Sequence, residues 1–187
     1  EVALEKLSYL TIASQSQALA KRVSGLFSAR YIQAGISDDI YGTEYASVLK
    51  NIFAIASGIC HGLGYGDNFQ AVLISNAIRE IKRFVDAVHP INRDINEPAY
   101  LGDLLVTAYS QFSRNRTFGN MIGNGYPVKS AQMEMNMIAE GYFAVKCLHE
   151  INKEHGVEMP VCEAVHAILY ENKQAAGAIL ALTKKLT

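Results

Sequence analysis

Lys50 stands in an apolar stretch with helical periodicity, Val48-Leu-Lys-Asn-Ile52. A lysine in such a helix either extends its stem to bring the ammonium to water or serves as a proton donor and acceptor, and this residue alone does not distinguish the two. Its helical stripe carries small side chains, Ser47, Ala54 and Ser57. We expect this stripe to leave a floor on which a ligand can rest.

Asp103 is a second candidate, because it lies within an apolar stretch between Gly102 and Leu104. Taken alone, it fits a capping or surface aspartate better than a functional one. The functional interpretation makes it the partner of a buried cation. Thr107 follows one helical turn later, so the two side chains can share a face.

The segment Ser113-Arg-Asn-Arg116 has the composition of a helix start that binds an anion. Ser113 can cap the helix, and the free N–H groups of a first turn attract phosphate, which an arginine can also bind. The alternative is an ordinary basic first turn at the surface. Two arginines at the positive end of a helix are unfavourable without an anion, which favours the binding site.

The elements that must position these residues fall into two parts. Residues 8–14 and 31–36 have the composition of strands, and a helix capped by Ser14 or Ser16 separates them and runs to Phe27. This βαβ unit is too small to cover its own sheet. We therefore interpret residues 1–40 as the C-terminal remnant of a dinucleotide-binding (Rossmann) domain and residues 41–187 as a helical domain.

The second part is mainly α. A helix over 41–63 is apolar around most of its circumference and is therefore expected to be central. Asp67 or Asn68 is expected to cap the next helix. We further predict that glycines 119, 123 and 125 interrupt the chain after a helix that starts at Ser113. The remaining helices are expected at about 67–89, 98–109, 139–155, 161–171 and 174–185.

Composition excludes several classes of protein. The formal net charge is −1, so no overall field attracts nucleic acid. No apolar run is long enough to span a bilayer, and no signal peptide is evident, so we expect a cytoplasmic protein. Cys60, Cys147 and Cys162 are expected to be buried, reduced thiols, and no spacing predicts a metal site.

Several segments, in this order and with these separations, resemble the NAD-dependent glycerol-3-phosphate dehydrogenases. The resemblance covers nearly the whole chain. It is carried by Ser37-Asp-Asp-Ile40, Leu49-Lys-Asn-Ile52, Gly62-Leu-Gly-Tyr-Gly-Asp-Asn68, Leu101-Gly-Asp-Leu104 with Thr107, Ser113-Arg-Asn-Arg-Thr-Phe-Gly119, Ala139-Glu-Gly141, and Gly156-Val-Glu-Met-Pro160 with Glu163-Ala-Val165.

The resemblance implies a helical substrate-binding domain of the 6-phosphogluconate-dehydrogenase-like type. The activity it implies is the interconversion of dihydroxyacetone phosphate and sn-glycerol 3-phosphate with NAD or NADP, for glycerophospholipid synthesis and carbohydrate metabolism. It also implies that a homodimer can form. The implied catalytic group is Lys50 with Asp103 and Thr107. The implied substrate contacts are Lys50, Asn51, Asp103, Ser113, Arg114 and Asn115, and the implied coenzyme contacts are Arg114, Ile138 and Glu140.

The sequence also departs from the family. His61 stands where Asp is common, and Ala108-Tyr109 replaces a Cys-Thr pair. The Gly-rich fingerprint for the pyrophosphate and a second characteristic lysine are absent, so residues 1–187 alone are expected to be nearly inactive. The alternatives are the helical domain of a related hydroxy-acid dehydrogenase and a non-catalytic dimerisation module.

Overall fold

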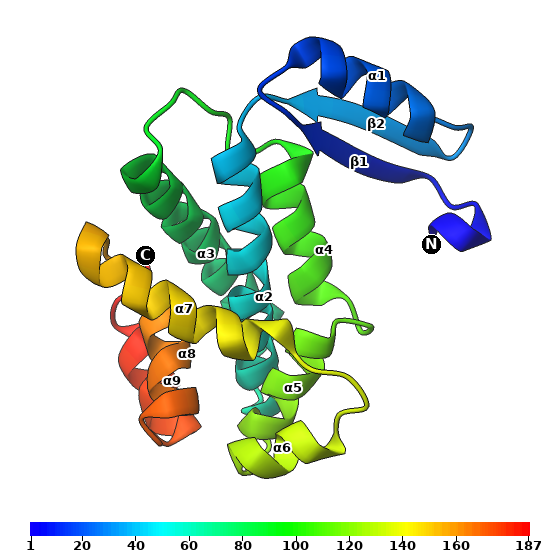
Figure 1. Ribbon diagram of the computed structural model, residues 1–187. Coiled ribbons are helices and arrows are strands. Elements are labelled where there is room, and N and C mark those ends of the chain that lie inside the picture. Colours follow the sequence, from blue (N-terminus) through cyan, green and yellow to red (C-terminus); the bar gives the residue numbers. More distant parts are fainter.

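The computed structural model describes residues 1–187 as a mainly helical body from which a small βαβ unit projects (Figure 1). The predicted fold class is confirmed. No helix combines the length and the apolar character needed to cross a bilayer.

The βαβ unit consists of β1 (Ser8–Ala13), α1 (Gln17–Phe27) and β2 (Ile32–Ser37). The strands are parallel and pair in register from Ser8 with Ile32 to Ala13 with Ser37. The hydroxyl of Ser16 accepts a hydrogen bond from the Leu19 amide, so Ser16 is the predicted cap of α1. Both strands and the helix lie where the sequence predicted them.

Helix α2 (Ile40–Gly62) runs through the centre of the body, as its apolar circumference predicted. Leu49, Ile52 and Phe53 are completely buried. The helix begins at Asp39, whose carboxylate accepts a hydrogen bond from the Gly42 amide. The elements that pack against α2 are α3 (Asp67–Val88), the π-helical turn η2 (Pro98–Gly102), α4 (Asp103–Tyr109), α5 (Arg114–Gly123), α7 (Glu140–His155) and α8 (Pro160–Tyr170). Helix α6 (Val128–Glu134) packs against α5, and α9 (Ala175–Thr183) packs against α5 and α8.

The contact between α2 and α5 brings two helix backbones together. A Cβ atom added to Gly119 would lie 2.1 Å from the Ile55 carbonyl oxygen, and one added to Gly58 would lie 2.1 Å from the Arg116 carbonyl oxygen. Gly62 and Gly123 face the opposite helix at similarly short distances. These glycines therefore serve close packing, since any side chain would separate the helices.

Some predictions about helix boundaries, helix caps and cysteine burial were wrong. Gly119 and Gly123 do not interrupt the chain but lie within α5, where the close contact with α2 explains them. Neither Asp67 nor Asn68 caps α3, because Gly66 occupies the cap position. Helix α6 was not predicted. All three cysteines are free, but Cys147 is exposed rather than buried.

A buried carboxylate fixes α8 against α3. Glu80 is fully buried and accepts hydrogen bonds from the amides of Val161 at 2.7 Å and Cys162 at 3.3 Å. Met159, at the cap position of α8, provides no side-chain cap, so Glu80 takes that role from another helix. Burial raises the pKa of Glu80 to about 7, although the two amides oppose the shift.

Gly119→Ala is expected to destabilise the fold by roughly 1–3 kcal/mol, because the new methyl group meets backbone that no rotamer change can move aside. Gly177→Ala is the matched control. Gly177 also lies inside a helix, but an added Cβ there meets nothing within 4 Å. The control should gain about 0.5–1 kcal/mol from helix propensity. Urea unfolding measures both variants, and equal effects would contradict the close contact.

The pKa of Glu80 predicts a pH dependence of stability. Because the folded-state pKa of about 7 exceeds the ordinary glutamate value of 4.5, the folded state retains a proton that the unfolded state loses. The group's contribution is therefore complete below about pH 4.5 and is lost as the pH rises through 7, by on the order of 3 kcal/mol. Glu80→Gln should flatten the unfolding free energy between pH 5 and 8, and parallel curves for variant and wild type would refute this origin.

Candidate functional site

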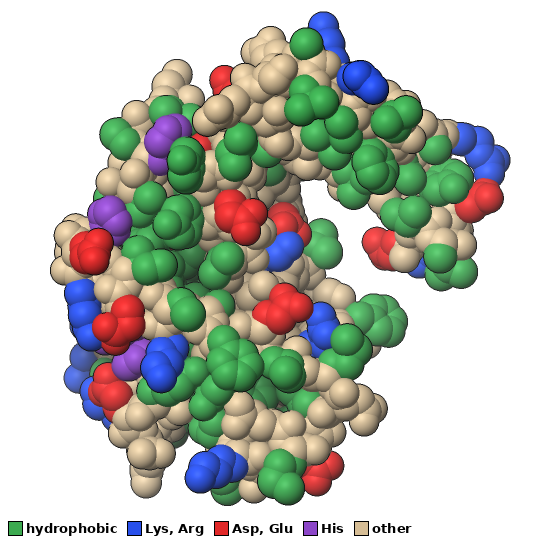
Figure 2. Space-filling view, viewed as in Figure 1, with side chains coloured by type: hydrophobic (Ala, Val, Ile, Leu, Met, Phe, Trp, Pro, Cys, Tyr) green, Lys and Arg blue, Asp and Glu red, His purple; other side chains and the backbone are tan.

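Lys50 and Asp103 form an ion pair between α2 and α4. Their Nζ and Oδ2 atoms are 2.5 Å apart, and the side chains are 23% and 37% exposed. Charged side chains gather on the concave face between the βαβ unit and the helical body in Figure 2. The Lys50 ammonium is therefore not simply extended into water. It is held by a carboxylate in a partly enclosed position, as the interpretation of Lys50 as a proton donor and acceptor requires.

The main chain of Asp103 is fixed by a hydrogen bond from Thr107. It is the first residue of α4, directly after the π-helical turn η2. The Thr107 hydroxyl donates to the Asp103 carbonyl oxygen at 2.7 Å. Thr107 therefore stabilises the turn that carries the carboxylate, and the Asp103 side chain accepts the hydrogen bond from the lysine.

The start of α5 is built as the sequence predicted. The Ser113 hydroxyl accepts a hydrogen bond from the Arg116 amide, which caps the helix. Arg114 is 42% exposed and lies 3.4 Å from Glu140, the first residue of α7. An exposed arginine beside a helix N-terminus is an arrangement that binds phosphate or another anion.

A chain of amide hydrogen bonds joins α2, α5 and α7. Asn115 donates to the Asn51 side-chain oxygen at 2.9 Å and accepts from the Gly141 amide at 2.9 Å. Together with the Lys50–Asp103 and Arg114–Glu140 pairs, these bonds bring the candidate residues of four helices into one connected group.

Ile138 lies at the edge of this group and is 64% exposed. It borders an apolar cavity of about 60 Å³ between α5 and α7, which Phe118 and Tyr142 also line. An exposed apolar side chain beside Arg114 and Glu140 forms an amphipathic edge. Such an edge suits one part of a large ligand that has both apolar rings and charged groups.

The expected ligand floor along α2 is wrong for Ala54 and Ser57, whereas Ser47 is partly exposed. Ser57 is buried, donates to Gln70 at 2.9 Å and to the Ala108 carbonyl oxygen at 3.0 Å, and thus links α2 to α3 and α4. Ala54 is also buried. The stripe below Lys50 therefore faces other helices. No cluster of three or more His, Cys, Asp or Glu side chains has metal-binding geometry.

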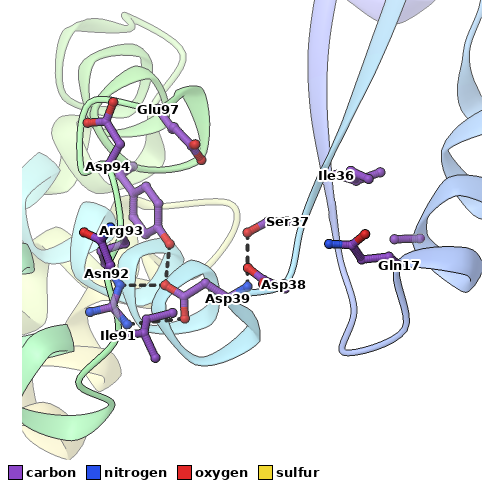
Figure 3. A pocket seen from close by; sticks show the side chains of 12 residues that line it. Gln17, Ile36, Ser37, Asp38, Asp39, Ile91, Asn92, Arg93, Asp94 and Glu97 are labelled. Carbon is purple, nitrogen blue, oxygen red and sulfur yellow. Dashed lines mark hydrogen bonds and ion pairs between the residues drawn. The ribbon is translucent and has the colours of Figure 1, made fainter.

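Sequence reasoning missed a buried network at the junction of the βαβ unit and the body. It borders a polar cavity of about 200 Å³, and Figure 3 shows Asp39 facing Arg93 there. Asp39 accepts hydrogen bonds from Arg93 at 2.7 Å and from the Tyr100 hydroxyl at 2.5 Å. Burial raises the pKa of Asp39, but these bonds outweigh it and leave the pKa below its ordinary value.

Arg93 also pairs with Asp86 at 2.5 Å and donates to the His89 carbonyl oxygen. The network ties the start of α2 to the end of α3 and to Tyr100, three residues before Asp103. Only the capping position of Asp39 could have been inferred from the sequence, because Arg93 and Tyr100 lie in segments without a recognisable pattern.

Comparison with known proteins identifies the chain's relatives. Residues 39–180 match the family described as "NAD-dependent glycerol-3-phosphate dehydrogenase C-terminus". The chain is 38% identical over 174 residues to "Glycerol-3-phosphate dehydrogenase [NAD(P)+] 2" of Salinibacter ruber, covering 93% of this chain and 51% of that protein. It is 38% identical over 182 residues to the Chlorobium limicola glycerol-3-phosphate dehydrogenase [NAD(P)+], covering 97% and 55%.

Comparison with solved structures identifies relatives of the same kind. The crystal structure of glycerol-3-phosphate dehydrogenase from Coxiella burnetii superposes with a TM-score of 0.94 at 32% identity, covering 98% of this chain and 56% of that one. The Saccharomyces cerevisiae enzyme gives a TM-score of 0.85 at 26% identity, covering 97% and 56%. The chain thus spans about half the length of these relatives. Nothing among them favours a hydroxy-acid dehydrogenase or a non-catalytic module.

Arg93→Ala tests the junction network. The variant leaves the buried Asp39 carboxylate without its cation, which should cost roughly 3–5 kcal/mol of unfolding free energy. Lys82→Ala is the control, since Lys82 pairs with Asp86 at 2.7 Å but is 52% exposed. The control should lose no more than about 1 kcal/mol. Urea unfolding at pH 7 compares them, and a mild effect of Arg93→Ala would remove the network's proposed structural role.

Proposed function

The chain belongs to the family of NAD-dependent glycerol-3-phosphate dehydrogenases, and from this premise we propose that it is the substrate-binding half of an enzyme that interconverts dihydroxyacetone phosphate and sn-glycerol 3-phosphate. The observation that carries the proposal is the Lys50–Asp103 pair beside the N-terminus of α5. A proton donor next to a phosphate-binding turn matches a substrate that has a carbonyl group and a phosphate.

Lys50 is the proposed proton donor in the direction of reduction. Its ammonium hydrogen-bonds the carbonyl oxygen of dihydroxyacetone phosphate and protonates it as the alcohol forms. NADH or NADPH, when bound, supplies the hydride. Asp103 holds the Lys50 amine in place and balances its charge. In the oxidative direction, the neutral amine accepts the hydroxyl proton.

The phosphate group is proposed to bind at the start of α5. The free amides of the first turn and the Arg114 guanidinium provide donors and positive charge. Ser113 lies next to this turn at the cap position, and Asn51 lies next to it on α2. Asn115, within the turn, is the third polar residue proposed to bind the substrate. Binding there would orient the carbonyl group toward Lys50.

The coenzyme is proposed to contact one edge of the chain, formed by Arg114, Ile138 and Glu140. This edge is exposed and amphipathic, as one side of a dinucleotide requires. The phosphate-binding glycine loop would belong to a dinucleotide-binding domain that residues 1–40 help to complete, with residues 41–187 as the substrate domain. We therefore expect residues 1–187 alone to bind NAD or NADP weakly and to turn over little.

We propose the metabolic role, the location and the assembly of the protein from the same family membership. The product is the backbone of glycerophospholipids, so the enzyme would serve phospholipid biosynthesis in the cytoplasm and draw its substrate from carbohydrate metabolism. A homodimer is the proposed assembly. The formal net charge of −1 gives no reason to propose a nucleic-acid partner.

Lys50→Ala in the full-length enzyme should lower kcat for the reduction of dihydroxyacetone phosphate by about 10²–10⁴-fold, because the proton donor is lost. Lys153→Ala is the control, since its exposed pair with Glu150 lies on the far part of α7. NADH oxidation measures the rate, and thermal unfolding shows that both variants fold. A Lys50→Ala enzyme that retains the wild-type rate would overturn the proposed role of this residue.

A further inference from the structure

Tyr100 connects the segment that carries Asp103 to the start of α2. It is the buried residue of the π-helical turn η2, whose other residues are partly or fully exposed. Its hydroxyl donates a hydrogen bond of 2.5 Å to the Asp39 carboxylate, which also accepts hydrogen bonds from Arg93 and the Gly42 amide. The side chain of Tyr100 therefore ends in a buried polar network and not in solvent.

The bond between Tyr100 and Asp39 joins a neutral donor to an ionised acceptor. Burial and the neighbouring carboxylate raise the pKa of the Tyr100 hydroxyl well above its ordinary value. Burial also raises the pKa of Asp39, but its hydrogen bonds outweigh this effect and lower the pKa. The phenol thus keeps its proton while the carboxylate is charged. Such a charge-assisted hydrogen bond is roughly twice as strong as one between neutral groups.

The turn η2 links this anchor to the backbone of Asp103. The Asp103 amide donates to the carbonyl oxygens of Pro98 and Tyr100, and the Asp103 carbonyl oxygen accepts from the Thr107 hydroxyl at 2.7 Å. The backbone of Asp103 is therefore held on both sides. Because the turn is anchored by its buried tyrosine, the direction of the Asp103 carboxylate depends on the position of Tyr100. Local π-helical turns are frequent at functional sites.

The same anchor also involves the helix that carries Lys50. Asp39 is the cap residue of α2, and Lys50 lies farther along this helix. The turn η2 packs against α2 and against β1. The hydrogen bond from Tyr100 to Asp39 thus ties the segment that carries Asp103 to the helix that carries its partner.

We propose that Tyr100 is a positioning residue that, through its hydrogen bond to Asp39, directs the Asp103 carboxylate toward Lys50. The inference rests on the proposed function, in which Lys50 donates the proton. It assigns to a buried hydroxyl a part in the chemical step. The proposed coenzyme edge lies at the starts of α5 and α7, so a change at Tyr100 should leave that edge in place.

The test is the kinetics of the full-length enzyme with Tyr100→Phe, which removes the hydroxyl and keeps the buried ring. The variant should lower kcat for the reduction of dihydroxyacetone phosphate by about tenfold, because a small displacement of Asp103 misplaces the proton donor. KM for the coenzyme should stay within about twofold of wild type, since the coenzyme edge is unchanged. A wild-type kcat, or a coenzyme KM that rises as much as kcat falls, would overturn the proposal.

Tyr170→Phe is the matched control. Tyr170 donates its hydroxyl to the Tyr142 carbonyl oxygen at 2.7 Å, and this bond joins α8 to α7 without involving η2 or α2. The control loses the same chemical group, so its kcat should remain within about twofold of wild type. Thermal unfolding of both variants measures general destabilisation. An equal fall of kcat in both variants would refute a specific role for Tyr100.

A double-mutant cycle with Asp103→Asn tests whether Tyr100 acts through Asp103. If it does, Tyr100→Phe should lower kcat in the wild-type background and add little in the Asp103→Asn background. Independent losses that multiply would refute the link. A wild-type full-length enzyme that does not reduce dihydroxyacetone phosphate would instead refute the proposed function, so the two failures are distinguishable.

Discussion

The close parallel contact between α2 and α5 sets the geometry on which the candidate site depends. The contacts repeat every four residues along both helices and join Asn51 to Asn115, Ile55 to Gly119 and Ile59 to Gly123. Glycine at positions 119 and 123 permits the contacts with Ile55 and Ile59. The hydrogen bond between Asn115 and Asn51 continues the same series. Because backbone lies on backbone, the helices have little freedom to slide, and the start of α5 is fixed beside Lys50.

The rest of the structure holds the acidic partner in place. Tyr100, three residues before Asp103, donates to Asp39 at the start of α2. The same helix therefore carries Lys50 and, through Asp39, anchors the segment that carries Asp103. The Lys50–Asp103 pair depends on a buried polar network at one end of α2, whereas the position of the first turn of α5 depends on glycine packing farther along α2.

The sequence was informative where a local pattern sufficed. Periodicity located α2, and serine caps located α1 and α5. The settings of Lys50 and Asp103 marked them only as candidates, and the family resemblance grouped them into the pair that the structure brings to 2.5 Å. Prediction from the sequence failed for residues whose role depends on a partner far away in the sequence. Gly119 was interpreted as a break because nothing local reveals α2 against it, and Arg93 had no pattern because its partners are remote in sequence.

The most direct measurement is a crystal structure of the full-length protein with coenzyme and sn-glycerol 3-phosphate bound. The account predicts that the phosphate lies against the first turn of α5 beside Arg114, and that the hydroxyl to be oxidised lies about 3 Å from the Lys50 Nζ atom. A substrate bound elsewhere, with Lys50 still paired to Asp103 and no ligand oxygen within reach, would contradict it.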